Sequence, residues 1–404
     1  MNQEIQPPAV LEISDPEIGL TAWLAVDSIL EHHFCGGLRM LPDVSASELM
    51  LLARAMTLKL GFLGLPHGGA KAGIQCDENT SKEDKLRLLA GFGQKVQDLL
   101  SNRIYLPGSD MGTSNQDIRD MFRILGIRVP KRALRGQASG WYTSLTVIAG
   151  AKAASTYQGF NLAGAAVAIE GFGAVGSSVA QGLEKFGCKV VAISTSQGAL
   201  YSPDGLDVAR LIEGLRRHGG KVLDFYNGAD RIDKESLLEL EVDVLMPCAR
   251  HHSIHMDNVT KIKAGLISSG SNAPITEEAE KTLSQRGVLC VPDFISNAGG
   301  VLGGTMEFAG LSRSAIEQFV DRDYSRQVSV LLEKARQEGV YIRDLAEQVA
   351  LERFARMKDA SRNHSARHRA FAFALEMYRD GMLPGILVGA LSQEYFRTRI
   401  EGKF

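Results

Sequence analysis

One lysine in this sequence stands in surroundings that are unusual for a charged side chain. Lys71 lies in the segment GLPHGGAKAG, residues 64–73, among four glycines, one proline and mostly apolar neighbours. A second lysine, Lys59, lies twelve residues earlier. Burial and a nearby cation both favour the neutral form of an amine, and an amine that is partly neutral near pH 7 can act as a general base. The segment therefore predicts a general base at position 71, and a surface lysine at a turn is the structural alternative.

A second segment has the spacing of a phosphate-binding turn. In AAVAIEGFGAVGSSVAQGLEKFGCKVVAIS, an apolar strand at 165–169 is followed by spaced glycines, a helix and another apolar strand. In the Gly-x-Gly-x-x-Gly fingerprint the three glycines permit a tight turn, a close approach of pyrophosphate, and close packing of helix on strand. The helix N-terminus then faces the anion. The segment predicts a dinucleotide site at Gly171, Gly173, Ala174, Val175 and Gly176, with a turn that binds no ligand as the alternative.

The residue at the end of the second strand bears on the choice of dinucleotide. An Asp or Glu normally occupies this place and binds the ribose 2′-hydroxyl group of NAD. This chain has Thr195 there, which we expect to contact the cofactor without supplying a carboxylate. The expected cofactor is NAD, and NADP is possible because this carboxylate is absent.

The elements that position Lys71 are predicted from helix-period apolar residues and from capping residues. Helices are expected at 45–60, 81–100 and 114–126, started by Ser45 or Ser47, by the segment SKED and by Ser114, respectively. Between the first two helices, GFLGLPHGGAKAGI is expected to form a strand that enters a glycine-rich turn. This turn would carry Lys71.

From about residue 141, short apolar runs alternate with helical segments. A helix is expected at 143–159, and the apolar runs VDVLMPCA, AGLISSGS and GVLCVPDF are expected strands. Such alternation implies a parallel sheet covered by helices on both faces. After about residue 310 the pattern is helical, with Pro384 before a last helix. We expect an α/β protein with a substrate domain at 1–140, a Rossmann-type domain at 141–325 and a C-terminal helical segment at 326–404.

The composition excludes several classes of protein. The chain has 404 residues, which is enough for two domains. Its 45 basic side chains are balanced by 47 acidic ones, and it has no basic run that would bind nucleic acid or an anionic membrane. It has no secretory signal pattern and no apolar run long enough to span a bilayer. Its five cysteines never form a CxxC pair, which favours reduced thiols in the cytoplasm.

Three segments around the dinucleotide unit together resemble the glutamate/leucine/phenylalanine/valine dehydrogenase family. They are MTLKLGFLGLPHGGAKAGI, LPGSDMGT and VPDFISNAGGV, and the similarity extends from about residue 34 to about residue 310. The resemblance implies a substrate domain, a dinucleotide-binding domain, and C-terminal helices that return to the first domain. It also implies a homo-oligomer that catalyses reversible NAD(P)-dependent oxidative deamination of an L-amino acid to a 2-oxo acid and ammonia.

The resemblance gives roles to residues that match the family motifs. Lys59 is similar to the lysine that binds the substrate α-carboxylate, and Lys71 to the catalytic lysine that activates water. Asp110 is similar to the catalytic aspartate that moves protons to and from the amino group. Asn297 resembles an asparagine near both cofactor and substrate, and the other cofactor contacts expected by resemblance are Thr143, Cys248, Ala249 and Asn272.

The side-chain pocket departs from the glutamate-specific pattern. Glutamate-specific members place a lysine before the GGLR segment and a serine after NAGGV, where this chain has Cys35 and Gly304. A buried substrate carboxylate would lack partners there, which is costly. We therefore expect an apolar branched-chain or aromatic substrate, in a pocket formed by Cys35, Gly36, Gly108, Val301 and Gly304.

Two other functions stay open. A non-catalytic sensor of nucleotide or amino acid would have no use for the lysine–aspartate pair, and a glutamate dehydrogenase with a rebuilt pocket would prefer glutamate. Ser144 and Thr146 replace family glycines, and His251 and His252 replace an acid–amide pair. No metal is expected, because no nearby cysteine or acid completes a site with these histidines.

Overall fold

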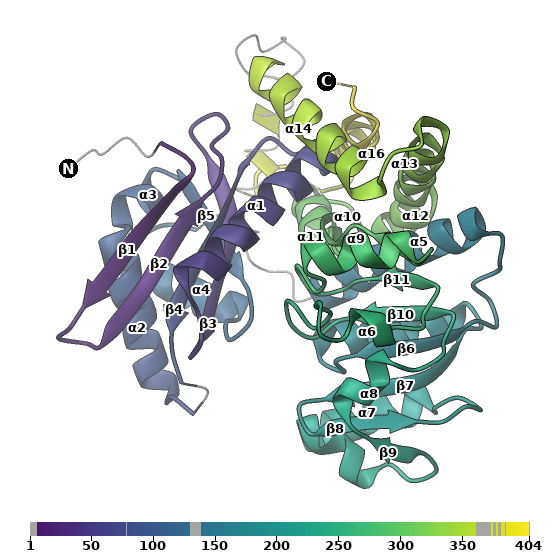
Figure 1. Cartoon of the computed structure of the whole chain (residues 1–404). Helices are drawn as coiled ribbons and strands as arrows, with labels where there is room; N and C mark the ends of the chain where they lie inside the picture. The colour runs from purple at the N-terminus through teal and green to yellow at the C-terminus, as the bar shows by residue number, and fades with distance from the viewer. Residues whose placement is uncertain are drawn as a thin grey trace. The chain divides into compact units, whose positions relative to one another are not determined.

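The computed structural model describes residues 6–77, 79–129, 139–360, 373–374, 377–378, 381–383 and 385–403. The chain divides into two compact α/β units, as expected (Figure 1). The first unit comprises residues 1–137, 306–311 and 349–404, and the second comprises 138–305 and 312–348. The final return to the first unit thus falls after residue 348, whereas the sequence placed the last boundary at 325.

The first unit is built on a five-stranded sheet with the order β1-β2-β4-β3-β5. Its strands are β1 (Ala9–Asp15), β2 (Leu20–Val26), β3 (Phe34–Leu41), β4 (Gly68–Gln75) and β5 (Tyr105–Ser109). β2 is antiparallel to β1 and β4, and β3 is parallel to β4 and β5. β3 therefore lies between the strand that contains Lys71 and the strand that leads to Asp110.

The N-terminal helices of the first unit are α1 (Ala46–Leu63), α2 (Lys82–Lys95), α3 (Gln97–Ser101) and α4 (Asn115–Ile124). Serine residues precede α1, α2 and α4, as the sequence predicts. The single helix expected at 81–100 is wrong, because Val96 leaves the helical conformation (φ −113°, ψ 21°) and separates α2 from α3. The side chains of Ser45, Ser81 and Ser114 accept hydrogen bonds from the backbone amides of α1, α2 and α4, respectively. Such caps satisfy amide groups that have no partner within the helix.

The expected strand over GFLGL is wrong. α1 continues to Leu63 and ends at Gly64, whose φ of +68° is the left-handed conformation that glycine adopts without strain. The strand β4 begins only at Gly68, so Lys71 lies within a strand rather than in a turn. Apolar residues at the end of α1 are buried in tertiary contacts, and these contacts extend the helix.

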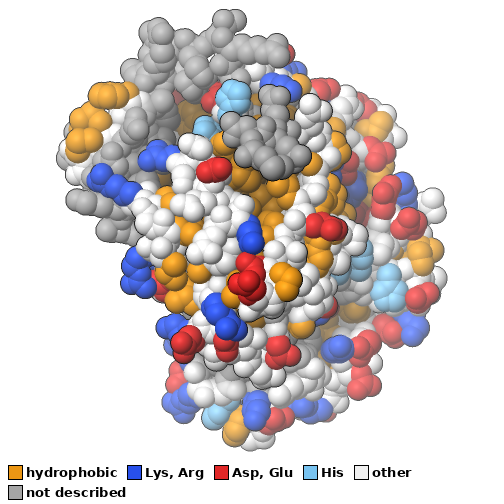
Figure 2. Space-filling view, turned by 90° about the vertical axis from the view of Figure 1, so that its left-hand side faces the viewer, with side chains coloured by type: hydrophobic (Ala, Val, Ile, Leu, Met, Phe, Trp, Pro, Cys, Tyr) orange, Lys and Arg blue, Asp and Glu red, His pale blue; other side chains and the backbone are white. Residues whose placement is uncertain are grey.

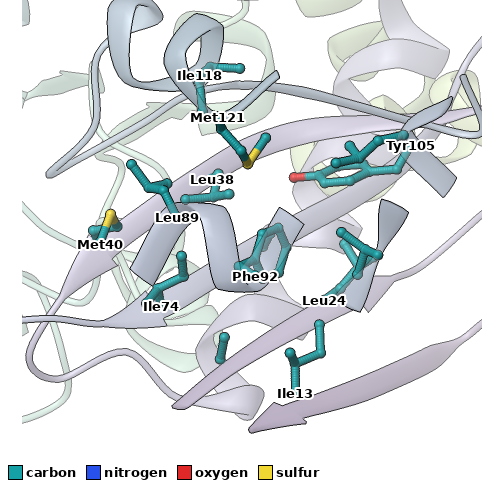
Figure 3. Close-up of a cluster of buried hydrophobic side chains, with 14 of the residues drawn as sticks. Ile13, Leu24, Leu38, Met40, Ile74, Leu89, Phe92, Tyr105, Ile118 and Met121 are labelled. Carbon is teal, nitrogen blue, oxygen red and sulfur yellow. The ribbon is translucent and has the colours of Figure 1, made fainter. Parts of the chain in front are cut away.

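A hydrophobic core fills the space between one face of this sheet and the helices α2 and α4 (Figure 3). The labelled side chains come from strands β1 to β5 and from both helices: Ile13, Leu24, Leu38, Met40, Ile74, Leu89, Phe92, Tyr105, Ile118 and Met121. Ala70 and Ala72 of β4 belong to this core. Because side chains alternate along a strand, Lys71 points to the opposite face of the sheet.

Helix α1 covers that opposite face around Lys71. A Cβ atom at Gly69 would lie 2.3 Å from the amide nitrogen of Thr57, and one at Gly73 would lie 2.8 Å from Leu49 Cδ1. The glycines on either side of Lys71 therefore let α1 approach the strand. All residues from Gly68 to Ile74 are buried in consequence.

The second unit contains a seven-stranded sheet with the order β12-β11-β10-β6-β7-β8-β9. Its strands are β6 (Ala166–Glu170), β7 (Lys189–Thr195), β8 (Gly198–Tyr201), β9 (Asp230–Ile232), β10 (Val244–Pro247), β11 (Leu266–Ser268) and β12 (Leu289–Val291). The strands from β12 to β7 are parallel, but β8 is antiparallel to β7 and β9. The expectation of a parallel sheet is wrong at this end, because a tight turn after Thr195 folds the chain back as a hairpin.

Helices flank this sheet and continue to the C-terminus. They are α5 (Ser139–Gln158), α6 (Ala174–Lys185), α7 (Val208–His218), η1 (Gly219–Phe225), α8 (Lys234–Leu238), η2 (Val259–Lys261), α9 (Glu277–Gln285), α10 (Asp293–Ser296), α11 (Gly299–Phe308), α12 (Arg313–Phe319), the π-helical turn η3 (Val320–Tyr324), α13 (Ser325–Glu338), α14 (Ile342–Ala360) and α16 (Gly385–Ile400). In the part of the chain that the structure describes, no helix is both long and apolar enough to cross a membrane.

The C-terminal helices return to the first unit, as the resemblance implied. Arg353 of α14 donates a hydrogen bond to the carbonyl oxygen of Phe62 in α1, and a Cβ atom at Gly61 would lie 2.3 Å from the carbonyl oxygen of Ala350. Pro384 and most of the helical pattern expected between about residue 361 and Pro384 lie outside the described residues. On the face shown in Figure 2, basic and acidic side chains are interspersed, which agrees with the small net charge of −2.

Candidate active site

Lys71 and Asp110 form a buried ion pair in the first unit. Lys71 Nζ contacts Asp110 Oδ2, and only 6% of the lysine side chain and 15% of the aspartate side chain are exposed. Asp110 directly follows the C-terminal end of β5, and Lys71 lies on β4. Between these strands, a Cβ atom at Gly37 of β3 would lie 2.9 Å from the Cβ atom of Asp110. Glycine at position 37 therefore leaves room for the aspartate.

The carboxylate of Asp110 is held from several sides. Its Oδ1 accepts a hydrogen bond from the backbone amide of Met111 (2.8 Å), and its Oδ2 also contacts Arg39 Nε (3.4 Å). Its backbone amide donates to Thr113 Oγ1 (2.9 Å), whose hydroxyl group donates to the carbonyl oxygen of Leu38 in β3 (2.8 Å). These bonds fix the loop that follows β5 to the neighbouring strand.

The charge state of Asp110 follows from these contacts. Burial raises the pKa of the carboxyl group, but the cations of Lys71 and Arg39 and the bonds to the carboxylate outweigh burial and lower this pKa to about 2. Asp110 is therefore ionised at neutral pH. An ionised carboxylate in this place can accept a proton from an ammonium group that binds beside it.

Arg39 is a site residue that the sequence analysis missed. It lies on β3, it is 4% exposed, and its Nη1 pairs with Glu48 Oε1 in the first turn of α1. The sequence shows Arg39 only as an arginine in the GGLR segment. Its acidic partners, Glu48 and Asp110, are not adjacent to it in the sequence, so the ion pairs could not be predicted.

The other expected residues of the first unit lie on α1, β3 and β5. Lys59 lies in α1 and is 5% exposed. Burial raises the pKa of the Cys35 thiol to about 12, so this side chain is neutral. A Cβ atom at Gly36 would collide with the carbonyl oxygen of Ala70, whereas one at Gly108 would meet no atom within 4 Å. Gly108 therefore borders open space, and Gly36 is required for strand packing.

The glycine fingerprint of the second unit has the geometry that a pyrophosphate needs. Gly171 has a φ of +88°, and a Cβ atom at Gly176 would lie 1.8 Å from the carbonyl oxygen of Gly171. A Cβ atom at Gly173 would meet no protein atom within 4 Å, and no side chain caps the helix α6 that begins at Ala174. The first and third glycines thus shape the turn, and the second leaves space before free amide groups.

Three further expected cofactor residues support this turn or lie at its edge. Ala249 limits the space at Gly171, since a Cβ atom there would lie 2.9 Å from the amide nitrogen of Ala249. Cys248 and Val175 both lie close to Gly270. A Cβ atom added at Gly270 would lie 2.7 Å from each of these two side chains. Thr195 ends β7, where its hydroxyl oxygen accepts a hydrogen bond from the amide of Gln197.

The asparagine pair expected near the cofactor is also brought together. Asn297 is 3% exposed, and its Nδ2 donates to the carbonyl oxygen of Ser271 (2.7 Å) and to Asn272 Oδ1 (3.3 Å). Its buried Oδ1 has no hydrogen-bond partner among the described residues. Such an acceptor fits a ligand that donates a hydrogen bond, because buried polar atoms are normally satisfied.

The two residues that replace family glycines have contacts of their own. Thr146 Oγ1 accepts a hydrogen bond from the amide of Gly299 at the start of α11, and Ser144 donates to the carbonyl oxygen of Trp141. Thr143, expected at the nicotinamide, is 8% exposed on the same helix, α5. On α11, a Cβ atom at Gly304 would meet no atom within 4 Å, and Val301 is half-buried.

A buried ion cluster, which no sequence pattern indicates, holds the loop that carries Asn272. Asp293 Oδ2 accepts a hydrogen bond from the amide of Ala273 (2.8 Å), and its Oδ1 binds Arg343 Nη2 (2.9 Å). Arg343, on α14, also binds Glu280 (2.7 Å). Because α14 is distant in the sequence, only folding unites these charges.

The histidines expected not to bind metal lie near one another. The rings of His251 and His252 are 5.2 Å apart in an edge-to-face arrangement, and His255 contacts Asp257. Among the described residues, no group of three or more His, Cys, Asp or Glu side chains is arranged to hold a metal ion.

Comparison with known protein families accounts for this combination of sites. Residues 137–362 match the model for glutamate/leucine/phenylalanine/valine dehydrogenase, and residues 8–125 match the dimerisation domain of the same enzymes. The chain belongs to this family. It is an NAD(P)-dependent amino-acid dehydrogenase, an oxidoreductase that acts on a CH–NH2 group.

The named relatives of this dehydrogenase include glutamate dehydrogenases. The glutamate dehydrogenase of Thermotoga maritima is 38% identical over 280 residues, which cover 66% of this chain and 67% of the relative. The NAD-specific glutamate dehydrogenase of Staphylococcus aureus is 35% identical over 278 residues, which cover 66% of each chain.

Solved structures with this fold include other members. A hetero-hexameric glutamate dehydrogenase from Thermus thermophilus in a leucine-bound form has a TM-score of 0.75 at 28% identity, with 88% of each chain covered. An L-tryptophan dehydrogenase from Nostoc punctiforme has a TM-score of 0.60 at 24% identity, with 87% of this chain and 96% of that chain covered. The second likeness shows the fold alone.

Proposed function

We propose that this dehydrogenase deaminates an L-amino acid with an apolar side chain, and that Lys71 and Asp110 are its catalytic pair. The buried ion pair between these residues is the observation that carries the proposal. Lys59, which is buried in α1, would bind the substrate α-carboxylate, as the resemblance to the family implies.

The proposed reaction uses the two catalytic groups in sequence. The Asp110 carboxylate accepts a proton from the substrate ammonium group, which leaves a neutral amine at Cα. The bound nicotinamide supplies the hydride acceptor for the Cα hydrogen. Lys71, once it has released its own proton to solvent, takes a proton from the water that attacks the imino carbon. Asp110 then returns its proton to the nitrogen atom of the resulting carbinolamine. The C–N bond breaks to release ammonia, and the hydroxyl proton passes to solvent as the C=O bond of the 2-oxo acid forms.

Two features of the first unit support an apolar side chain on the substrate. Cys35 is a neutral thiol where glutamate-specific members place a lysine, and Gly108 borders open space. Gly304 on α11 supplies no hydroxyl group where those members have serine. A glutamate substrate is the competing proposal, and it is favoured by the names of the two relatives.

The cofactor, assembly and compartment follow from separate observations. We propose NAD as the cofactor with NADP accepted, since Thr195 has no carboxylate that would repel a 2′-phosphate. A homo-oligomer is supported by the dimerisation-domain match, and the hetero-hexameric relative supports an oligomer in general. All five cysteines are free, which supports a reducing compartment such as the cytoplasm.

A substrate and cofactor panel tests the proposal. The absorbance of reduced nicotinamide is followed with NAD and with NADP, in both directions, for leucine, valine, phenylalanine, tryptophan and glutamate. We expect higher kcat/KM for at least one apolar substrate than for glutamate. A double variant, Cys35→Lys with Gly304→Ser, is expected to reverse this order. Faster turnover of glutamate by the parent would favour the competing proposal, and absence of turnover with every substrate would favour a sensor.

A further inference from the structure

Arg39 connects the catalytic pair to a second buried carboxylate. Its Nε contacts Asp110 Oδ2 (3.4 Å), and its Nη1 pairs with Glu48 Oε1. The exposed fractions of the Arg39 and Glu48 side chains are 5% and 10%. With Lys71, these residues form a cluster of two cations and two anions in the first unit.

We propose that Arg39 is a positioning residue for Asp110, and that Glu48 sets how much of the arginine charge acts on that aspartate. This inference rests on the proposed function, in which Asp110 and Lys71 exchange protons with substrate and water. It assigns a role to a strand residue and a helix residue that would act through Asp110.

The first argument concerns the charge that remains during the reaction. A guanidinium group does not lose its proton in a protein, whereas the proposed reaction requires Lys71 to become neutral. Asp110 then retains Arg39 as its only cationic partner among the described residues that contact it. Without Arg39, a buried carboxylate beside a neutral amine would favour its protonated form.

The second argument concerns geometry. Leu38 of β3 pairs with Ser109 of β5, so the next residues along the two parallel strands, Arg39 and Asp110, are neighbours. The planar guanidinium group presents Nε to Asp110 and Nη1 to Glu48, and these two contacts fix its orientation.

Glu48 is itself held in place by the start of α1. Its backbone amide donates to Oγ of Ser45, the residue that caps the helix. A carboxylate in the first turn is also stabilised by the helix dipole. Glu48 is thus held where its carboxylate competes with Asp110 for Arg39.

The charged groups that contact Asp110 come from two neighbouring strands and are Lys71 of β4 and Arg39 of β3. The phenol of Tyr105 in β5 lies in the hydrophobic core, and its own pKa is raised by burial, by Cys35 and by Asp110. Removal of Arg39 therefore raises the pKa of Asp110. Removal of the Glu48 charge acts in the opposite sense, because Arg39 then has one anionic partner instead of two.

This difference in sign separates positioning from simple structural support. Both Arg39→Met and Glu48→Gln break the same ion pair, so a structural role predicts similar losses in both. We expect Arg39→Met to lower kcat by about 10²-fold with KM changed by less than about threefold, and to move the acid limb of kcat/KM to higher pH. We expect Glu48→Gln to lower kcat by less than about tenfold and to move the acid limb to no higher pH.

The experiment measures kcat, KM and the pH profile of the full-length parent and variants, with circular dichroism to check folding. The double variant Arg39→Met/Glu48→Gln leaves neither charge buried alone, and it replaces Arg39→Met if that protein does not fold. Its acid limb should also move to higher pH. Lys85→Met is the matched control, because Lys85 forms an ion pair with Asp117 elsewhere in the same unit (2.8 Å).

An unchanged pH profile and kcat in Arg39→Met, or in the double variant, would overturn the inference. So would acid limbs that move upward equally in Arg39→Met and Glu48→Gln. If Lys71→Ala and Asp110→Asn abolish turnover while the Arg39 variants do not alter it, the inference fails and the proposed function stands. If Lys71→Ala retains full turnover, the proposed function itself fails.

Discussion

Lys71 and Asp110 meet across β3, where Gly37 lies too close to Asp110 for any side chain. The glycines on either side of Lys71 have a different effect. Because Gly69 and Gly73 lack side chains, helix α1 packs closely against the face of β4 that carries the lysine. The lysine is thereby buried by its own domain, and its charge is met by Asp110.

Loss of either member of the catalytic pair should abolish turnover without unfolding the protein. We expect Lys71→Ala and Asp110→Asn to lower kcat by about 10²- to 10⁴-fold, because each removes a proton-transfer group. Steady-state kinetics at saturating amino acid and cofactor measure the effect. Lys85→Ala breaks a lysine–aspartate pair in the same unit and should retain kcat. Turnover by Lys71→Ala within about tenfold of the parent would contradict the assignment.

The second and third glycines of the fingerprint should respond differently to a methyl group. Gly173→Ala adds the methyl group to open space beside the N-terminus of α6, where the pyrophosphate would bind. We expect about tenfold weaker NADH binding, measured by fluorescence titration, with an unchanged urea midpoint. Gly176→Ala places the methyl group against the carbonyl oxygen of Gly171 and should lower the free energy of unfolding by about 1–3 kcal/mol. Equal NADH affinity in Gly173→Ala and the parent would argue against a pyrophosphate at this turn.

Position 195 should control the choice between NAD and NADP. An aspartate at the end of β7 would bind the ribose 2′-hydroxyl group of NAD and repel the 2′-phosphate of NADP. We expect Thr195→Asp to raise the ratio of kcat/KM for NAD over NADP by at least about tenfold. Thr195→Ser, which adds no charge, is the control. If both variants give the same ratio, the ribose does not bind beside residue 195.

Glu170, at the end of β6, should make stability depend on pH. Burial raises the pKa of its carboxyl group from 4.5 to about 7, against the opposing effects of Ser253 and Lys234. Between these two pKa values the Glu170 carboxyl group is protonated in the folded protein but has lost its proton in the unfolded chain. Stability is therefore lost as the pH rises from about 4.5 to about 7, and the loss is complete above that range.

Replacement of Glu170 by glutamine removes this titration. We expect Glu170→Gln to be more stable than the parent by about 2–3 kcal/mol at pH 8 and by much less at pH 4.5, from urea unfolding curves. Glu184→Gln, at an exposed position of α6, should show no such pH-dependent difference. A constant difference between Glu170→Gln and the parent at all pH values would show that ionisation of this group does not contribute.

The sequence predicted those parts of the protein that depend on neighbouring residues. Ser45, Ser81 and Ser114 start helices because a serine oxygen can accept a hydrogen bond from an amide only three residues ahead. The glycine fingerprint and the α/β class could likewise be predicted from residues that are close together in the sequence. Lys71 and Asp110 were found through motifs, and the structure brings them together as an ion pair.

Contacts between distant segments decided the rest. The strand at Lys71 and the extra turns of α1 arise because the helix and β4 bury each other, which no local pattern records. Arg39 pairs with Glu48 and Arg343 pairs with Glu280, and in each pair the two residues lie on different elements. These ion pairs therefore form only when the chain has folded. The sequence thus determined which residues have the chemistry of a dehydrogenase. Only the tertiary structure decided which charges face one another, because electrostatic interactions depend on distance in space rather than on separation along the chain.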